Sequence, residues 1–258
     1  MSFGLNPDPQ ERLEMLSSYT MEEFPALEAH FDKFDLPSLG RALHKHGVVQ
    51  LPDFLPKPLR QALEQQFDGL LDAHGKRIDV RVRSTGNTPR KYVSVSRHPV
   101  FEHSSLIPQL YFDPVLMQFF AALAGTEVIP APYEPEQIVV NLMNQEGDTH
   151  GWHWDDYTYS VVLVLAAPDR LNGAQVECVD GTSWNKDSAQ VEHYLRAKTV
   201  RSLDLTAGAA YMLQGKRVMH RVSPMLRADT RKIICFTYAT DAERHLVLDH
   251  ASMQDIYG

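Results

Sequence analysis

The sequence predicts a mainly β protein with helices, built as a double-stranded β-helix (a cupin-like jelly roll) with an N-terminal helical part packed on one sheet. Residues from about 8 to 75 show mostly helical apolar spacing, whereas from residue 136 onward short β-type runs alternate with turns rich in Gly, Asp, Asn and Pro. Seven or eight short strands at this spacing are typical of a sandwich or jelly roll. We therefore expect a single domain over residues 1–258, mainly helical in 1–125 and a jelly roll in 126–258.

The individual elements follow from the periodicity and from the residues that interrupt it. Proline stands at or near several of the expected helix starts, where its missing N–H is not needed. Helices are expected near 9–19, 21–34, 36–46, 56–74 and 108–124. Strands are expected at 47–51, 92–96, 137–144, 160–166, 174–179, 199–205, 209–214, 217–222 and 231–239.

Composition limits the classes of partner. The chain has 43% hydrophobic and 22% charged residues, which is ordinary for a globular domain, and its net charge is −8. An acidic surface disfavours nucleic acids and anionic membranes as partners and is compatible with cationic small molecules. A small-molecule substrate is therefore expected, and a homodimer is compatible with the sequence.

The termini and cysteines favour a cytoplasmic protein. The N-terminus has neither the basic region nor the apolar segment of a signal peptide, and the longest apolar run, 161–167, is too short to span a bilayer. Cys178 and Cys235 are far apart in strand-like runs. We expect both to be buried free thiols, with a single disulfide as the alternative.

A metal site is indicated by His153, Asp155 and the distant His220, which is expected on a strand of the facing sheet. Residues two apart share one face of a strand, so a His-x-Asp pair between β-rich runs can chelate one ion. A second His-x-Asp pair at His30 and Asp32 lies in a stretch with helical spacing, where positions two apart diverge, so it is not expected to bind a metal. Two imidazoles and one carboxylate are the ligand set of non-heme Fe(II) oxygenases.

The order of these motifs resembles the 2-oxoglutarate- and Fe(II)-dependent dioxygenases. The matching motifs are His153-x-Asp155, the stretch 172–176 with one glycine of the usual pair missing, His220-x-Val222-x-Pro224, and Arg231. The resemblance implies Fe(II), 2-oxoglutarate and O2 as cofactors, with Arg231 holding the distal carboxylate of 2-oxoglutarate. The planar fork of an arginine suits a carboxylate. Asn141, on an expected strand, is predicted to contact 2-oxoglutarate as well.

Within that superfamily the block 148–157, which reads DTHGWHWDDY, resembles the free-amino-acid radical halogenases that act on lysine-like substrates. The likeness extends over most of the chain, including Pro89-Arg90 and the stretch 134–136. Those enzymes have glycine where Asp155 stands, which opens a coordination position for chloride. Because Asp155 fills that position, the resemblance implies a hydroxylase relative, and halogenation is not expected.

The same resemblance assigns substrate contacts. Glu136 and Asp156 would hold the cationic amines of a free basic amino acid, while Arg90 and His150 would meet its carboxylate. A zwitterion with an additional cation needs partners of both signs in a partly dry pocket. The alternatives are that Asp156 only supports its neighbour or a turn, that His150 is structural, and that Glu136 and Arg90 are solvated charges.

The sequence therefore predicts hydroxylation of an unactivated C–H bond of a free basic amino acid, with L-lysine favoured, yielding the hydroxy-amino acid, succinate and CO2. Ornithine, arginine or a peptidyl side chain are alternative substrates. A rival of another class is a non-catalytic or zinc-binding cupin-like protein, in which His150 would replace Asp155 beside the two other histidines.

Overall fold

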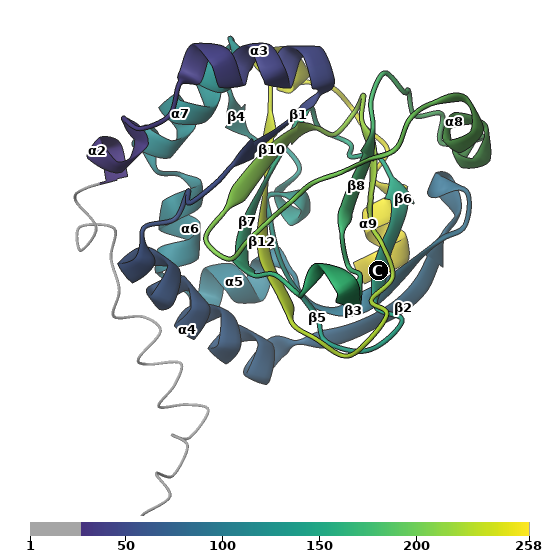
Figure 1. Ribbon diagram of the computed structural model, residues 1–258, viewed down its shortest axis with the longest axis horizontal. Coiled ribbons are helices and arrows are strands. Elements are labelled where there is room, and N and C mark those ends of the chain that lie inside the picture. The colour runs from purple at the N-terminus through teal and green to yellow at the C-terminus, as the bar shows by residue number, and fades with distance from the viewer. Residues whose placement is uncertain (1–26, 258) are drawn as a thin grey trace, which may run out of the picture.

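The computed structural model describes residues 27–257, in which twelve strands form one antiparallel sheet. The sheet curls back on itself (Figure 1). The strands are β1 (Val48–Leu51), β2 (Lys76–Val82), β3 (Thr88–Val95), β4 (Ile129–Pro130), β5 (Ile138–Met143), β6 (Thr149–His153), β7 (Tyr159–Ala166), β8 (Val176–Val179), β9 (Arg201–Ser202), β10 (Ala210–Gln214), β11 (Met219–Val222) and β12 (Arg231–Ala239). Their order is β1-β10-β7-β12-β5-β3-β6-β11-β8-β9, with β2 paired to β3 and β4 to β12. The prediction of a mainly β jelly roll with helices is confirmed.

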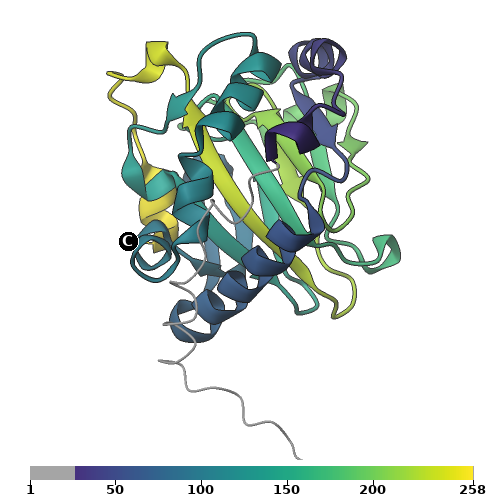
Figure 2. The same ribbon diagram turned by 90° about the vertical axis from the view of Figure 1, so that its left-hand side faces the viewer.

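Most helices lie on one face of this sheet. The helices are α2 (Leu27–Phe31), α3 (Leu36–His46), α4 (Lys57–His74), α5 (Arg97–His103), α6 (Leu106–Tyr111), α7 (Pro114–Ala124), α8 (Val191–Ala197) and α9 (Ala251–Tyr257). Within residues 27–257 there are also four short 3-10 helices: η2 (Arg83–Thr85), η3 (Glu134–Glu136), η4 (Arg170–Asn172) and η5 (Asp241–Glu243). Figure 2 shows α4, α6 and α7 lying across one face of the sheet, where they pack on β10, β7, β12 and β5. The helix expected at 9–19 lies outside the described residues, and of the one expected at 21–34 only α2 is described.

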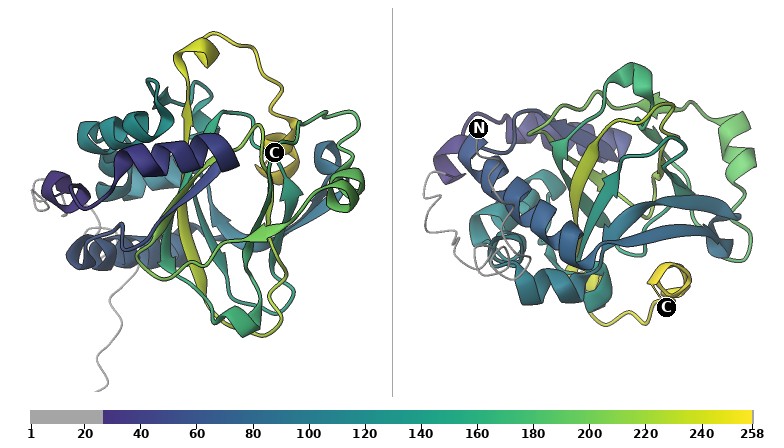
Figure 3. Two further views of the ribbon diagram at one scale, coloured as in Figure 1. Left: turned by 45° about the horizontal axis from the view of Figure 1, so that its top comes forward. Right: turned by 90° about the horizontal axis from the view of Figure 1, so that it is seen from below.

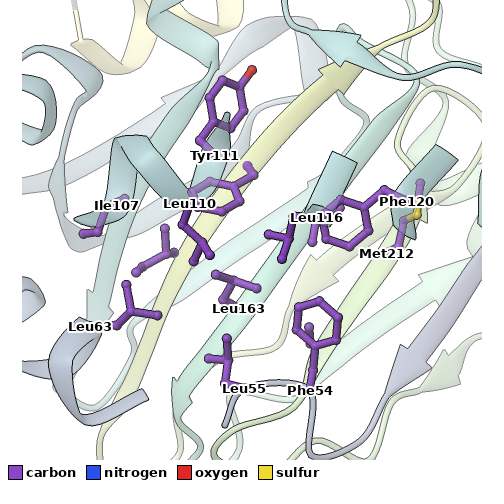
Figure 4. Packing of buried hydrophobic residues seen from close by; sticks show 14 of the residues in the cluster. Phe54, Leu55, Leu63, Ile107, Leu110, Tyr111, Leu116, Phe120, Leu163 and Met212 are labelled. Carbon is purple, nitrogen blue, oxygen red and sulfur yellow. The ribbon is translucent and has the colours of Figure 1, made fainter. Parts of the chain in front are cut away.

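Strand β12 contributes side chains both to the hydrophobic core and to the lining of a cavity. Ile234, Phe236 and Tyr238 belong to the large cluster under the helices, whereas Arg231 and Cys235 line the cavity. This alternation follows from the two-residue period of a strand. Figure 4 shows the helix side of the arrangement, where side chains of α4, α6 and α7 pack on those of the strands. Burying each large apolar side chain contributes about 1.5–3 kcal/mol.

Local sequence explains where helix α3 begins and ends. The Asp35 side chain accepts a hydrogen bond from the Ser38 N–H at 3.1 Å, which satisfies one of the free donors of the first turn. Gly47 ends the helix in the left-handed region at φ 70°. The helix thus occupies the predicted range.

The single helix predicted over 108–124 is wrong. The chain forms α6 and α7 instead, and the break lies at Phe112 and Asp113. Asp113 caps α7 by accepting from the Leu116 N–H at 2.9 Å, and Pro114 takes the first helical position, where it cannot continue a preceding helix.

The cavity is lined in part by β3 and by helix α9, which was not predicted from the sequence; β2, which was not predicted either, pairs with β3. Strand β3 joins the two halves of the sheet because it pairs with both β5 and β6. Helix α9 packs against β2 and η2, and Figure 3 shows it beside the β2–β3 hairpin. The Tyr257 hydroxyl lies 2.8 Å from Ser94 Oγ, which ties α9 to β3.

Two smaller expectations can be compared directly with the structure. Cys178 and Cys235 are free thiols, as predicted, the first buried and the second partly buried. None of the helices within residues 27–257 is long and apolar enough to cross a membrane.

Candidate metal and substrate site

The cavity enclosed by the curled sheet has a volume of about 150 Å³. Side chains from β3, β5, β6, β7, β8, β10, β11 and β12 line it, together with the loop that follows β6 and with helix α9. All nine residues selected from the sequence lie along this one cavity: Arg90, Glu136, Asn141, His150, His153, Asp155, Asp156, His220 and Arg231. The fold therefore collects side chains that are up to 141 positions apart in the chain.

Three of these residues form a compact ligand set. Asp155 Oδ1 lies 3.8 Å from His153 Nε2 and 3.6 Å from His220 Nε2. The three ligand atoms lie within 4.8 Å of one another, which is close enough for one ion to contact all of them. Two imidazole nitrogens and one carboxylate oxygen on one side of an ion leave the opposite side free for other ligands.

Backbone carbonyls orient both imidazoles. His153 Nδ1 lies 2.8 Å from the Gly151 oxygen, and His220 Nδ1 lies 3.0 Å from the Val218 oxygen. A carbonyl oxygen can only accept, so each Nδ1 carries the proton and each Nε2 presents its lone pair toward Asp155. This is the usual arrangement of a metal-binding histidine.

The expectation that His220 comes from a sheet facing that of His153 is wrong. Strands β6 and β11 are antiparallel neighbours, and His220 pairs directly with His153. Directly opposed residues of an antiparallel pair have Cβ atoms about 4.5–5.5 Å apart, so the ladder itself brings the two rings together. The ring centroids are 4.0 Å apart.

Asp155 lies beyond the end of β6 and is held by two neighbours. Ser160 Oγ donates to Asp155 Oδ2 at 2.7 Å, which leaves Oδ1 facing the two imidazoles. The Asp155 N–H donates to the Gly215 oxygen at 3.2 Å. A Cβ atom at position 215 would overlap the Asp155 carboxylate, so the close approach requires glycine.

His150 lies beside the ligand set without joining it. Its ring is stacked on His153 with centroids 4.0 Å apart and an interplanar angle of 6°. Nitrogen lone pairs lie in the ring plane, so two parallel stacked rings cannot both point at one ion. Burial, and then the positive charge of Arg90, lower the pKa of His150 well below its usual value, so the ring is neutral.

The other side of the cavity carries Arg231 and Asn141. The Arg231 guanidinium is buried and hydrogen-bonds with the hydroxyl of Tyr211. Asn141 is also buried, and its Oδ1 has no hydrogen-bond partner among the described residues. A buried cation and a free amide group next to a metal ligand set suit an anionic ligand.

Arg90 is a buried side chain, not a surface charge. It is 1% exposed, and its Nη1 donates to Thr88 Oγ1 at 3.0 Å and to the Gly151 oxygen at 3.3 Å, while its Nε has no partner. Burial lowers the pKa of Arg90 to about 10, which still leaves it protonated at neutral pH. No carboxylate among residues 27–257 lies within 4.0 Å of either Arg90 or Arg231.

Glu136 and Asp156 form an acidic pair, buried like Arg90, so Glu136 is not a solvated edge charge. His250 Nδ1 lies 2.7 Å from Glu136 Oε1 and 3.8 Å from Asp156 Oδ2. Burial, and then the negative charge of Asp156, raise the pKa of Glu136 to about 9. The pair therefore holds a proton at neutral pH.

Lys186 forms an ion pair with Asp156 of this acidic pair, a contact that was not predicted from the sequence. Its Nζ lies 2.5 Å from Asp156 Oδ1, and it also donates to the Asp249 carbonyl oxygen. His250 and Ser160 were likewise not predicted. Lys186 and His250 lie in loops without periodicity, so the sequence contained no signal that could have found them.

Solved structures of low sequence identity share the fold. The epimerase SnoN, in complex with Fe3+, alpha ketoglutarate and nogalamycin RO, has a TM-score of 0.64 at 15% identity, covering 86% of this chain and 90% of its own. AviO1 from Streptomyces viridochromogenes Tue57 has a TM-score of 0.61 at 19% identity, covering 81% and 96%. A Trichoplax adhaerens prolyl hydroxylase, in complex with a hypoxia inducible factor peptide fragment, has a TM-score of 0.57 at 12% identity, covering 90% and 99%.

The jelly roll and its His-Asp-His ligand set place this chain in the class of Fe(II)- and 2-oxoglutarate-dependent oxygenases. The donor set is that of a non-heme iron site, and the buried guanidinium of Arg231 fits a carboxylate of the keto acid. Within this class the chain belongs to the HalD family, described as Halogenase D, whose model matches residues 31–258. No curated protein sequence matches the chain.

Proposed function

We propose that this protein hydroxylates an unactivated C–H bond of a free basic amino acid, with L-lysine as the preferred substrate. The observation that carries the proposal is the position of Asp155, whose Oδ1 faces both imidazole nitrogens and completes a three-residue ligand set. Iron, when bound there with 2-oxoglutarate and O2, supplies the oxidising power for this reaction, and succinate and CO2 are the co-products.

The protein side chains bind and orient the two organic molecules. His153, Asp155 and His220 would hold the iron, and Arg231 would pair with the distal carboxylate of 2-oxoglutarate. Asn141 would donate to or accept from the same keto acid through its side-chain amide. Burial of these groups excludes water, which strengthens each charged contact.

The substrate contacts are proposed from the charges that remain in the cavity. Arg90 is buried without a carboxylate partner, so it would pair with the carboxylate of an amino acid, assisted by the neutral His150. Glu136 and Asp156 would pair with its amines. Opposite charges at separate parts of the cavity orient a zwitterion, which positions one carbon toward the metal site.

The small volume of the cavity, and the helix α9 that lines one side of it, favour a free amino acid over a peptide as substrate. A volume of about 150 Å³ is below the range of roughly 300–1,000 Å³ that is usual for pockets of drug-sized ligands. Met253, Ile256 and Tyr257 of α9 line the cavity, where a peptide would need an open groove. Ornithine and arginine satisfy the same charge pattern as lysine.

The number of protein ligands at the metal site favours hydroxylation over halogenation. A halogenase of this kind needs a ligand position for chloride, and in this chain the Asp155 carboxylate takes up that position. Ser160 and Gly215 hold the carboxylate there, which leaves no vacancy on the protein side of the ion. The family description thus names a reaction that this ligand set does not favour.

The decisive experiment is mass spectrometry of the products formed from a panel of amino acids and peptides with Fe(II), 2-oxoglutarate and chloride. We expect L-lysine to gain one oxygen atom with equimolar formation of succinate. Asp155→Asn is a matched control, because it retains the shape of the side chain and removes its charge. Failure to form succinate with any free amino acid would contradict the substrate class, and a chlorine isotope pattern would contradict the role of Asp155.

The rival zinc-binding or non-catalytic function is less well supported. It needs His150 as a third nitrogen ligand, but this ring is stacked parallel to His153. Anaerobic addition of Fe(II) and 2-oxoglutarate should produce a weak visible charge-transfer band, which zinc would not give. Absence of this band together with tight zinc binding would favour the rival.

A further inference from the structure

The cation that occupies the acidic pair in this structure belongs to the protein itself. Lys186 Nζ lies 2.5 Å from Asp156 Oδ1 and also contacts the Asp249 carbonyl oxygen. The Asp156 side chain is 4% exposed and that of Lys186 is 25% exposed, so the ammonium reaches a buried carboxylate from the surface. An ammonium group is therefore accommodated at the position where the proposed substrate needs one.

The surroundings of Lys186 allow its ammonium group to move away from Asp156. It lies in a segment without helix or strand between β8 and α8, and its neighbours on both sides are exposed. In the same position its ammonium lies over the ring of Trp184, 4.4 Å from the centroid, so a cation–π contact supports it beside Asp156. The long, flexible lysine stem on this exposed segment can carry the ammonium away from Asp156 when another cation takes its place.

The other atoms of the acidic pair are already in contact with polar groups. Glu136 Oε1 faces His250 at 2.7 Å, and Asp156 Oδ2 faces Ser252 Oγ at 3.4 Å. The charge that an incoming ammonium meets at Asp156 is therefore largely neutralised by Lys186. An incoming cation must either displace the Lys186 ammonium or bind beside it and be repelled by its positive charge. Both effects weaken the binding of cations and leave the binding of ligands without a cationic group unaffected.

We propose that Lys186 is a specificity-determining residue whose ammonium group competes with the substrate's ammonium group for Asp156. This inference rests on the proposed use of Glu136 and Asp156 to bind an amine. Lys186 raises the concentration of cationic substrate that is needed to fill the cavity, and it keeps Asp156 paired while the cavity holds no substrate. It has no contact with the metal ligands and no part in the chemistry.

The test is a calorimetric binding measurement on the enzyme loaded with Fe(II) and 2-oxoglutarate in the absence of O2. The probes are L-lysine, L-norleucine, which lacks only the side-chain ammonium group of lysine, and n-butylammonium, a minimal alkylammonium ion. Lys186→Met removes the charge and retains most of the stem. We expect Kd for lysine and n-butylammonium to fall about tenfold and Kd for norleucine to change less than twofold. Lys186→Arg retains the charge and should keep the wild-type values.

Lys216→Met is a matched control. Lys216 also pairs with a buried carboxylate of the chain after β12, Glu243, at 3.0 Å, but Glu243 does not line the cavity, whereas Asp156 does. If Lys186 acted only by fastening this segment, both variants would change all three probes alike, and the proposal would be wrong. It would also be wrong if Lys186→Met left Kd for n-butylammonium unchanged or raised it, or if n-butylammonium bound to neither protein.

These outcomes separate the inference from the proposed function. A wild-type enzyme that hydroxylates lysine, with an unchanged Kd in Lys186→Met, overturns only the role of Lys186. A wild-type enzyme that turns over no basic amino acid, while the variant binds n-butylammonium more tightly, overturns only the substrate.

Discussion

Replacing Ser160 with alanine should weaken iron binding although Ser160 is not an iron ligand. Its hydroxyl donates to Asp155 Oδ2 at 2.7 Å and thereby keeps Oδ1 directed at the two imidazoles. Removing a group that orients a metal ligand usually lowers metal affinity about 10- to 100-fold. The Asp155 side chain is 21% exposed, so water can partly replace the hydroxyl, and we expect the lower end of this range, about tenfold.

The measurement is an anaerobic Fe(II) titration of the metal-free protein against a competing chelator. Ser252→Ala is the matched control, because Ser252 Oγ lies 3.4 Å from Asp156, the carboxylate next to the ligand. The control should change Kd for Fe(II) less than twofold. An unchanged Kd in Ser160→Ala would show that the backbone contacts of Asp155 alone orient its carboxylate, and it would refute the orienting role of the Ser160 hydroxyl.

Three further predictions concern other parts of the cavity. Arg231→Lys should raise KM for 2-oxoglutarate about tenfold, measured by succinate formation, with Kd for Fe(II) unchanged, because a lysine cannot form the bidentate contact. Gly215→Ala should abolish Fe(II) binding in the same titration while circular dichroism remains native, because its Cβ would overlap the Asp155 carboxylate. Since the raised pKa of Glu136, about 9, keeps a proton on it at neutral pH, binding an ammonium there must release that proton. Kd for L-lysine should therefore fall as pH rises from about 6.5 to 8.5, by up to tenfold per pH unit, and calorimetry should show this slope to vanish in Glu136→Gln.

Local patterns were sufficient to predict most of the fold. The period of two in strand β12 separates Phe236 and Tyr238 from Arg231, so that strand could be located from the sequence. The break before α7 was also readable, because Asp113 followed by Pro114 is a helix start, but the apolar run across it was interpreted as continuous.

Pairing between distant segments could not be predicted in the same way. Strands β6 and β11 each show only short patterns, and nothing in them specifies that His153 pairs with His220 directly. The proximity of Lys186 to Asp156 depends on the path of an irregular loop, which no periodicity describes. Chemistry-bearing residues within a recognisable motif were therefore predictable, whereas Lys186 and His250, which lie in loops without a motif, were not.

The adjacent carboxylates of Asp155 and Asp156 connect the two proposed functions of the cavity. Asp155 faces the imidazoles, and Asp156 faces Lys186 and His250. Their Cα atoms are separated by one peptide unit, about 3.8 Å, so the proposed iron ligand and the proposed amine-binding group cannot move independently. The position of the oxidised carbon relative to the metal depends on that separation, and small displacements of this kind change rates strongly. Ser160 and Gly215, by holding Asp155, would therefore also hold the proposed amine-binding end of the cavity in register with the metal site.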